Sequence, residues 1–285
     1  MSHQDIYLRQ PAQVTLHVRK WGSGECALVL LHGFGEGSYV WNHIAPQLTR
    51  HGCVLALDFR GHGDSDPDPQ GRYALASHVA DASFAMSYFN LRNVILVGHS
   101  FGARIAIDLM ASQSHRVRGL VLVDGGPDLD AGSLAHIQRQ FVSQPWRYER
   151  IEDYIAHLEG AYPVAQRTLL AQIAPNALRD DEGGGYRLKC DVKLGESLET
   201  ENDLALWRTL ASLSQPLLVL RGSASAVLPR RIAQRMAMEL KNCTLRNIPE
   251  AGHAIMLDNP AAFVTAITGF IAHLREMETR HEFRL

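Results

Sequence analysis

The sequence predicts an α/β fold in which a mostly parallel central sheet carries helices on both faces and a helical cap is inserted. Short runs of consecutive apolar residues recur along the chain and end in Gly, Asp or His, as buried parallel strands do. Segments with helical periodicity separate these runs, which is typical of a parallel sheet. From residue 128 to 214 only helix-like patterns occur. We therefore expect one core domain, residues 1–127 and 215–285, with a cap (lid) at 128–214.

The expected strands follow from two patterns. Residues 13–20 alternate apolar and polar side chains, which predicts a half-exposed strand at the edge of the sheet. Continuous apolar runs predict buried parallel strands at 27–31, 53–57, 94–97, 120–123 and 217–220, and a further strand is expected at 243–248.

Helical periodicity predicts helices at 75–89, 103–110, 230–240 and 261–274. Pro229 and Pro260 stand at the starts of the last two, where proline is favourable because the first helical N–H needs no partner. Within the cap, amphipathic segments at 137–141 and 154–158 predict further helices, and the polar, glycine-rich stretch 180–185 predicts an exposed loop.

The composition excludes several classes of protein. The 285 residues contain 28 Lys and Arg against 30 Asp and Glu, without a long basic stripe, so we expect no nucleic-acid partner. No apolar run approaches the roughly 18 residues of a membrane span, and the first residues lack the basic and then apolar build of a signal peptide. We therefore expect no membrane span and a cytoplasmic protein.

The four cysteines are widely spaced along the chain: Cys26, Cys53, Cys190 and Cys243. They form no Cys-x-x-Cys pair and have no nearby histidines at the spacing of metal ligands. We expect buried free thiols and no metal site.

The strongest chemical signal is Gly98-His99-Ser100-Phe101-Gly102, which directly follows the 94–97 run and precedes a helical pattern. This context is the strand, tight turn and helix of a nucleophile elbow. The two glycines leave room for a strained turn that projects the Ser100 hydroxyl at the carboxyl edge of the sheet. Because a serine hydroxyl is a weak nucleophile, it needs a base, and we assign His253, which follows the expected strand 243–248.

A glycine-rich turn follows the 27–31 strand and reads His32-Gly33-Phe34-Gly35. The backbone N–H groups of Phe34 and Phe101 are predicted to form an oxyanion hole. His32 is expected to be a structural residue of this turn, because His253 already supplies the base.

With these motifs the sequence resembles the α/β-hydrolase fold superfamily, and in particular its small serine esterases and thioesterases with a helical cap. The resemblance covers nearly the whole chain and rests on residues 32–35, 58–65, the elbow around Ser100 and Gly252-His253, in the same order. It implies that Arg60 and His62, in the 58–65 loop, organise that loop and take no part in catalysis.

The chain departs from this family at the acid of the catalytic triad. In most members the acid follows the seventh strand in a pattern like Gly-x-x-Asp, whereas here Ser225 stands at that position, three residues after Gly222. A serine hydroxyl can bind the imidazole of the base but cannot stabilise imidazolium as a carboxylate does.

A second acid position is known in the superfamily, after strand six, and this chain has Asp124 there. We therefore expect Asp124 to be the triad acid. The alternative is that Asp124 caps or braces the loop that enters the cap, so that His253 is oriented by Ser225, by a water or by no group. Asp258 is a weaker rival, because its place before Asn259-Pro260 favours a helix-capping role.

The sequence thus predicts a serine hydrolase that cleaves a carboxylic ester or thioester of a small-molecule acyl substrate through an acyl-enzyme on Ser100, without cofactor or metal. A serine at the elbow argues against the dehalogenases and epoxide hydrolases that share the fold, since they carry Asp there. Two alternatives stay open. One is a carbon–carbon bond hydrolase, lactone hydrolase or acyltransferase with the same triad, and the other is a ligand-binding protein without turnover. Substrate identity, acyl-chain length and oligomeric state are left open.

Aromatic residues of the cap are expected to form a pocket lid or to pack the cap onto the sheet: Phe141, Trp146, Tyr148, Tyr154, Tyr162 and Trp207. Trp41, outside the cap, is expected in the core or in the pocket wall.

Overall fold

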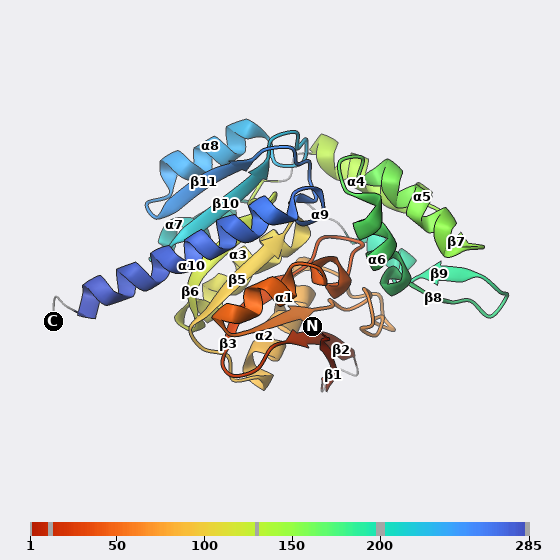
Figure 1. The fold of residues 1–285 in the computed structure, drawn as a ribbon, viewed down its shortest axis with the longest axis horizontal. Coiled ribbons are helices and arrows are strands. Elements are labelled where there is room, and N and C mark those ends of the chain that lie inside the picture. The colour runs from red at the N-terminus through yellow and green to blue at the C-terminus, as the bar shows by residue number, and fades with distance from the viewer. Residues whose placement is uncertain (1, 11–13, 129–130, 198–202, 283–285) are drawn as a thin grey trace.

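The structure is a computed structural model that describes residues 2–10, 14–128, 131–197 and 203–282. Its main sheet has eight strands, shown in Figure 1. In spatial order they are β1 (Gln4–Arg9), β2 (Thr15–Trp21), β4 (Cys53–Leu57), β3 (Cys26–Leu31), β5 (Val94–His99), β6 (Val117–Val123), β10 (Leu217–Gly222) and β11 (Cys243–Ile248). From β4 to β11 all neighbours pair in parallel, whereas β1 with β2 and β2 with β4 pair antiparallel.

The six strands predicted from 27–31 to 243–248 are confirmed, but the edge position predicted for 13–20 is wrong. Residues 15–21 form β2, which lies between β1 and β4 and is mostly buried. The alternating pattern predicted exposed polar side chains, but His17 and Arg19 are buried and pair with acidic residues. His17 contacts Asp58, and Arg19 lies 3.7 Å from Asp5. Residue 13 lies outside the described residues.

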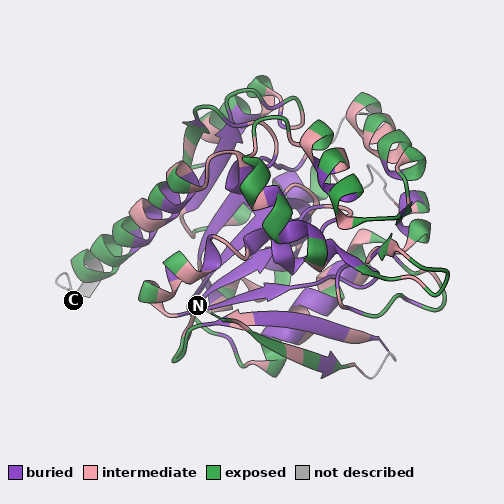
Figure 2. Cartoon of the chain, turned by 45° about the vertical axis from the view of Figure 1, so that its right-hand side comes forward, coloured by how far each residue is buried: buried purple, intermediate pink, exposed green. Residues whose placement is uncertain are grey.

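Helices cover both faces of the sheet, as predicted. One face carries α1 (Ala45–Leu48), α9 (Ile255–Asp258) and α10 (Pro260–Glu282), and the other carries α2 (Leu75–Tyr88), α3 (Phe101–Gln113), α7 (Asp203–Ser212) and α8 (Arg230–Glu239). Alternate strand residues point to opposite faces, so Leu28 and Leu30 join one apolar cluster while Val29 and Leu31 join the other. Figure 2 shows the buried sheet between helices whose outer surfaces are exposed.

The segment between β6 and β10, which we call the insertion, lies beside the sheet in Figure 1 apart from its last helix. It contains α4 (Ala131–Ser143), α5 (Ile151–Ala161), α6 (Arg167–Ala177) and α7, together with a small antiparallel sheet in the order β7 (Arg147–Tyr148), β9 (Tyr186–Leu188), β8 (Leu178–Asp180). Strands this short leave no apolar run, which is why the sequence did not predict them. The predicted loop 180–185 begins at the end of β8 and forms its turn into β9.

The last helix of the insertion packs on the core. Leu206, Trp207 and Leu210 of α7 belong to the same apolar cluster as α3. Residues 129–130 and 198–202 of the predicted cap lie outside the described part of the chain. The division into a core at 1–127 and 215–285 and a cap at 128–214 stays a prediction.

Short 3-10 helices complete the secondary structure: Ser38–Trp41, Thr49–His51, Ser114–Arg116 and Val192–Glu196. Among the described residues, no helix is long and apolar enough to cross a membrane. All four cysteines are free thiols, but only Cys53 is buried, and the other three are partly exposed.

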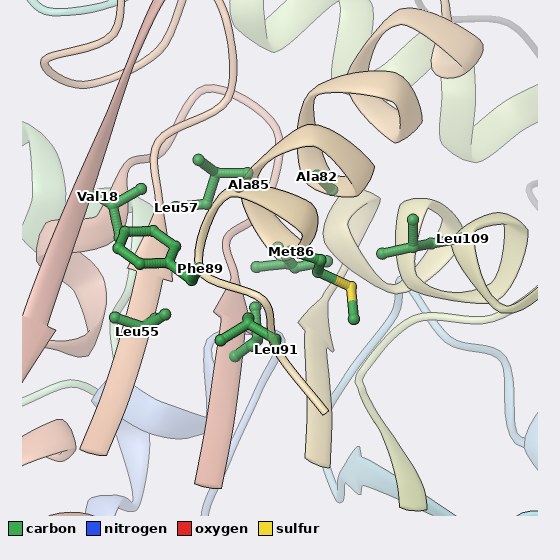
Figure 3. Close-up of a pocket in the computed structure, with 11 residues that line it drawn as sticks. Val18, Leu55, Leu57, Ala82, Ala85, Met86, Phe89, Leu91 and Leu109 are labelled. Carbon is green, nitrogen blue, oxygen red and sulfur yellow. The ribbon is translucent and has the colours of Figure 1, made fainter. Parts of the chain in front are cut away.

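A small apolar cavity lies between α2, α3 and the sheet (Figure 3). Its volume is about 10 Å³, and its walls include Val18, Met86 and Leu109. A space of this size is at the lower limit for one water molecule, and it offers no polar partner. It is a packing gap in the apolar core.

Candidate active site

The predicted elbow joins β5 to α3. Ser100 has φ +53° and ψ −114°, a backbone conformation that L-residues rarely adopt. A Cβ on Gly98 would lie 2.3 Å from the carbonyl oxygen of Gly102, and a Cβ on Gly102 would lie 2.5 Å from the carbonyl oxygens of Leu31 and His32. Only glycine fits at either position, so the local sequence holds Ser100 in a strained turn at the end of a buried strand.

Ser100 and His253 line one cavity of about 1140 Å³ at the carboxyl edge of the parallel strands, and α4 and α5 supply part of its wall. No hydrogen bond joins the Ser100 hydroxyl to His253 in the described structure. Such bonds are often long in the absence of substrate and shorten in the complex. The cavity therefore brings the predicted nucleophile and the predicted base together without aligning them.

Asp124 is fully buried beside the imidazole of His253. Its Oδ2 lies 2.7 Å from Nδ1 of His253 and accepts a hydrogen bond from the hydroxyl of Ser225. Its Oδ1 accepts a hydrogen bond of 3.0 Å from the backbone N–H of Gly222. Because a carboxylate only accepts, Nδ1 of His253 donates, which leaves Nε2 free to take a proton.

Asp258 occupies a different place from the one expected. The cap of α10 is Asn259, whose Oδ1 accepts from the N–H of Ala262 at 3.1 Å, so the predicted capping role of Asp258 is wrong. Asp258 instead accepts the N–H of Gly252 at 2.8 Å, and burial raises the pKa of its carboxyl. It therefore holds the turn that precedes His253.

The predicted oxyanion residues come from two turns, Phe34 from the turn after β3 and Phe101 from the elbow itself. Phe34 and Phe101 both line the cavity, with ring centroids 5.8 Å apart. Within the described ranges neither backbone N–H donates a hydrogen bond, whereas the neighbouring N–H of Gly33 donates to Glu36 at 2.8 Å. Unpaired backbone N–H groups at a cavity can donate hydrogen bonds to an oxygen that develops negative charge.

The sequence did not single out Glu36 or His99. Oε2 of Glu36 lies 3.1 Å from Nδ1 of His99, and Nε2 of His99 lies 3.1 Å from the carbonyl oxygen of His253. Burial favours the neutral form of each group, but their mutual attraction outweighs it, lowering the pKa of Glu36 to about 2 and raising the pKa of His99. No periodicity marks a residue in a glycine-rich turn, so only the fold shows this pair.

Other residues from the motifs have structural partners. Arg60 forms ion pairs with Asp81 and Asp68 and does not line the cavity. His62 is buried, which lowers its pKa to about 3. His32 accepts the N–H of Phe59 at 3.1 Å, as suits a residue that organises a turn. Trp41 is fully buried in the core and lies outside the cavity wall.

Half of the aromatic residues named for the insertion reach the cavity. Phe141, Tyr154 and Tyr162 line it, whereas Trp146, Tyr148 and Trp207 do not. Trp207 packs under the guanidinium of Arg235 at 4.0 Å and donates its indole N–H to Asp128.

The described residues hold one group with metal-ligand geometry, and it lies outside the cavity wall. His17, Asp58 and Asp64 place one ligand atom each within 4.8 Å of one another. All three are committed to protein partners, since His17 pairs with Asp58 at 2.6 Å and Asp64 pairs with Lys189 at 2.6 Å. This geometry fits a buried polar network.

Comparisons with known proteins agree with the fold. The sequence profile of the "Alpha/beta hydrolase family" matches residues 28–266. The chain is similar to 2-(acetamidomethylene)succinate hydrolase of Mesorhizobium japonicum, with 26% identity over 260 residues that cover 91% of this chain and 92% of the relative. It is also similar to pimeloyl-[acyl-carrier protein] methyl ester esterase of Pectobacterium carotovorum, with 28% identity over 273 residues that cover 90% and 98%.

Among solved structures, the crystal structure of E-2-(acetamidomethylene)succinate hydrolase matches with a TM-score of 0.84 and 24% identity, over 95% of this chain and all of that one. The protein therefore has the α/β-hydrolase fold, as its motifs predicted. The chain belongs to the alpha/beta hydrolase family. These relatives are named as hydrolases, and hydrolysis is the class of reaction that the family supports.

Proposed function

We propose that this protein is a serine hydrolase that cleaves a carboxylic ester or thioester through an acyl-enzyme on Ser100. The observation that carries the proposal is the 2.7 Å contact between Asp124 and His253, at the cavity that the strained Ser100 of the elbow also lines. A methyl ester esterase among the relatives supports an ester as substrate. A carboxylate on His253 favours catalysis over ligand binding without turnover.

The geometry supports a two-step reaction. Ser100 attacks the carbonyl carbon while Nε2 of His253 takes the hydroxyl proton, and Asp124 stabilises the imidazolium that forms. The N–H groups of Phe34 and Phe101 stabilise the oxyanion. His253 then gives its proton to the leaving alcohol or thiol. In the second step a water, deprotonated by His253, attacks the acyl-enzyme and releases the acid and Ser100.

The cavity wall supports an acyl group with a sizeable apolar part. The wall that the insertion supplies carries apolar side chains, including Ile137, Phe141 and Leu158, together with polar ones such as Gln140 and His157. Burying such a group in the cavity contributes about 0.8 kcal/mol for each methylene removed from water. In this proposal residues 128–214 act as the cap of the acyl site.

The test is a reaction of the purified protein with a fluorophosphonate probe, followed by peptide mass mapping. The probe reacts with an activated serine whatever the natural substrate is. We expect labelling at Ser100, none in Ser100→Ala, and strongly slowed labelling in His253→Gln. A folded wild-type protein that takes up no label at Ser100, or labels equally fast without His253, would contradict the proposal.

A further inference from the structure

One buried carboxylate connects the three loops that make up the candidate site. Oε2 of Glu36 accepts the N–H of Gly33 at 2.8 Å, in the turn after β3 that carries Phe34. The same oxygen lies 3.1 Å from Nδ1 of His99, the residue before the nucleophile. His99 in turn reaches the carbonyl oxygen of His253 at 3.1 Å, in the loop after β11.

The hydrogen-bond partners define the protonation of His99. A carbonyl oxygen can only accept, so Nε2 of His99 carries a hydrogen that points to His253. A carboxylate can also only accept, so Nδ1 carries a hydrogen that points to Glu36. Two donating nitrogens correspond to an imidazolium, and the direction of the shifts, a raised pKa of His99 and a lowered pKa of Glu36, supports this state.

The other titratable groups around His99 leave the pair intact. Asp124 and Glu36 favour its positive charge, and the nearby ring of His32 has a lowered pKa because it is buried. Asp258 also interacts with His99, and the ring of His253 lies 4.6 Å away, centroid to centroid. From the insertion, the hydroxyl of Tyr162 lies 3.3 Å from Oε1 of Glu36.

A buried ion pair is a poor source of stability, because removing two charges from water costs about as much as their attraction returns. It is well suited to fixing geometry, since hydrogen bonds in which a partner is charged are about twice as strong as neutral ones. We propose that Glu36 and His99 are positioning residues whose ion pair holds the backbone of His253 and the oxyanion turn in place for reaction at Ser100. This inference rests on the proposed function, and Tyr162 extends the connection to the insertion.

The main variant is Glu36→Gln, which removes the charge but keeps the shape and an oxygen to accept the N–H of Gly33. His99 then becomes neutral and still donates from Nε2 to His253. We expect kcat for p-nitrophenyl butyrate to fall on the order of tenfold with little change in KM, because a charge-assisted bond is replaced by a neutral one. The melting temperature should not fall, as the buried charges are removed together.

The second measurement is the protonation of His99. A purely structural role of Glu36 would leave this protonation unchanged in the Glu36→Gln variant. In ¹⁵N-histidine NMR spectra at pH 7.5, assigned with His99→Gln, we expect both nitrogens of His99 protonated in the wild type and only Nε2 protonated in Glu36→Gln. Tyr162→Phe should keep the imidazolium signature. Glu239→Gln, which removes an exposed carboxylate paired with Arg235, is the control and should change neither kcat nor the spectrum.

Each outcome decides between the two proposals. A neutral His99 in an active wild-type enzyme, or a Glu36→Gln enzyme with unchanged kcat, overturns the positioning role and leaves the proposed function standing. A wild-type protein that shows the imidazolium but no fluorophosphonate labelling at Ser100 overturns the proposed function and the positioning role with it.

Discussion

The hydroxyl of Ser225 donates a hydrogen bond to Oδ2 of Asp124, the oxygen that also faces Nδ1 of His253. The two residues meet because β6 and β10 are parallel neighbours in register, with Val123 opposite Leu220. Their carboxyl ends therefore open at the same place on the sheet edge. The serine at the usual acid position thus supports a carboxylate that reaches the histidine from the neighbouring strand.

Replacing Asp124 tests which group acts as the acid. Asp124→Asn keeps the size of the side chain but removes the charge and favours the wrong tautomer of His253, so kcat should fall by roughly 10⁴ with little change in KM. Steady-state kinetics on p-nitrophenyl butyrate measures this. Asp258→Asn is the matched control and should cost far less, because Asp258 accepts a backbone N–H. A near-normal rate in Asp124→Asn would remove Asp124 from the mechanism.

Because β6 and β10 end at the same place on the sheet edge, we expect that the acid of the triad can be moved from position 124 to position 225. Ser225→Ala should lower kcat by less than about tenfold, since Asp124 keeps its bonds to His253 and Gly222. The double variant Asp124→Asn with Ser225→Asp should recover at least about tenfold of the activity lost in Asp124→Asn, because a carboxylate again faces the imidazole. A double variant that is no faster than Asp124→Asn would show that a carboxylate at position 225 does not reach His253.

The sequence predicted those parts of the site that depend on a local pattern. The elbow needs glycines at 98 and 102 within one turn, and the apolar runs before Ser100 and Asp124 place both residues at the ends of buried strands. The carboxyl ends of parallel strands lie at one edge of the sheet. The places of Ser100, Asp124 and His253 after their strands were therefore enough to predict that the three residues lie near one cavity.

Contacts that depend on side-chain direction could not be predicted. Glu36 and His99 are 63 positions apart and have no pattern in common, so only the packed turn shows that they pair. The edge strand β1 was missed because its residues are largely exposed and carry no apolar run. The burial of His17 and Arg19 was missed because a polar residue gives no sign in the sequence of the partner that will neutralise it.

Two glycines give opposite predictions for the same substitution. Gly102→Ala places a Cβ against two backbone carbonyls at 2.5 Å, and we expect it to destabilise the protein by at least about 1–3 kcal/mol. Gly160→Ala meets no atom within 4 Å and lies in α5, so it should stabilise the protein by up to about 1 kcal/mol. Chemical denaturation of both variants measures the free energy of unfolding. Equal effects at the two positions would contradict the close packing of the elbow on β3.

Stability should decrease as the pH falls from 6.5 to 4.5, because buried histidines bind protons less readily in the folded protein than in the unfolded chain. Burial lowers the pKa of His62 from 6.5 to about 3, and burial also lowers the pKa values of His32 and His78. Between pH 6.5 and 4.5 the unfolded chain binds a proton at His62 and the folded protein does not, and the lowered pKa values of His32 and His78 act in the same direction. The free energy of unfolding therefore decreases as pH falls, by up to about 1.4 kcal/mol per pH unit for each such group.

The contribution of one buried ring can be isolated. His62→Gln removes a group that only the unfolded chain protonates, so its pH dependence between 6.5 and 4.5 should be shallower than that of the wild type by about one proton. The glutamine can lower stability at pH 7, but the slope is read independently of that offset. His273→Gln, at an exposed position of α10, is the matched control and should keep the wild-type slope. Urea unfolding at several pH values gives these slopes, and an unchanged slope in His62→Gln would show that the ring is accessible to protons in the folded protein.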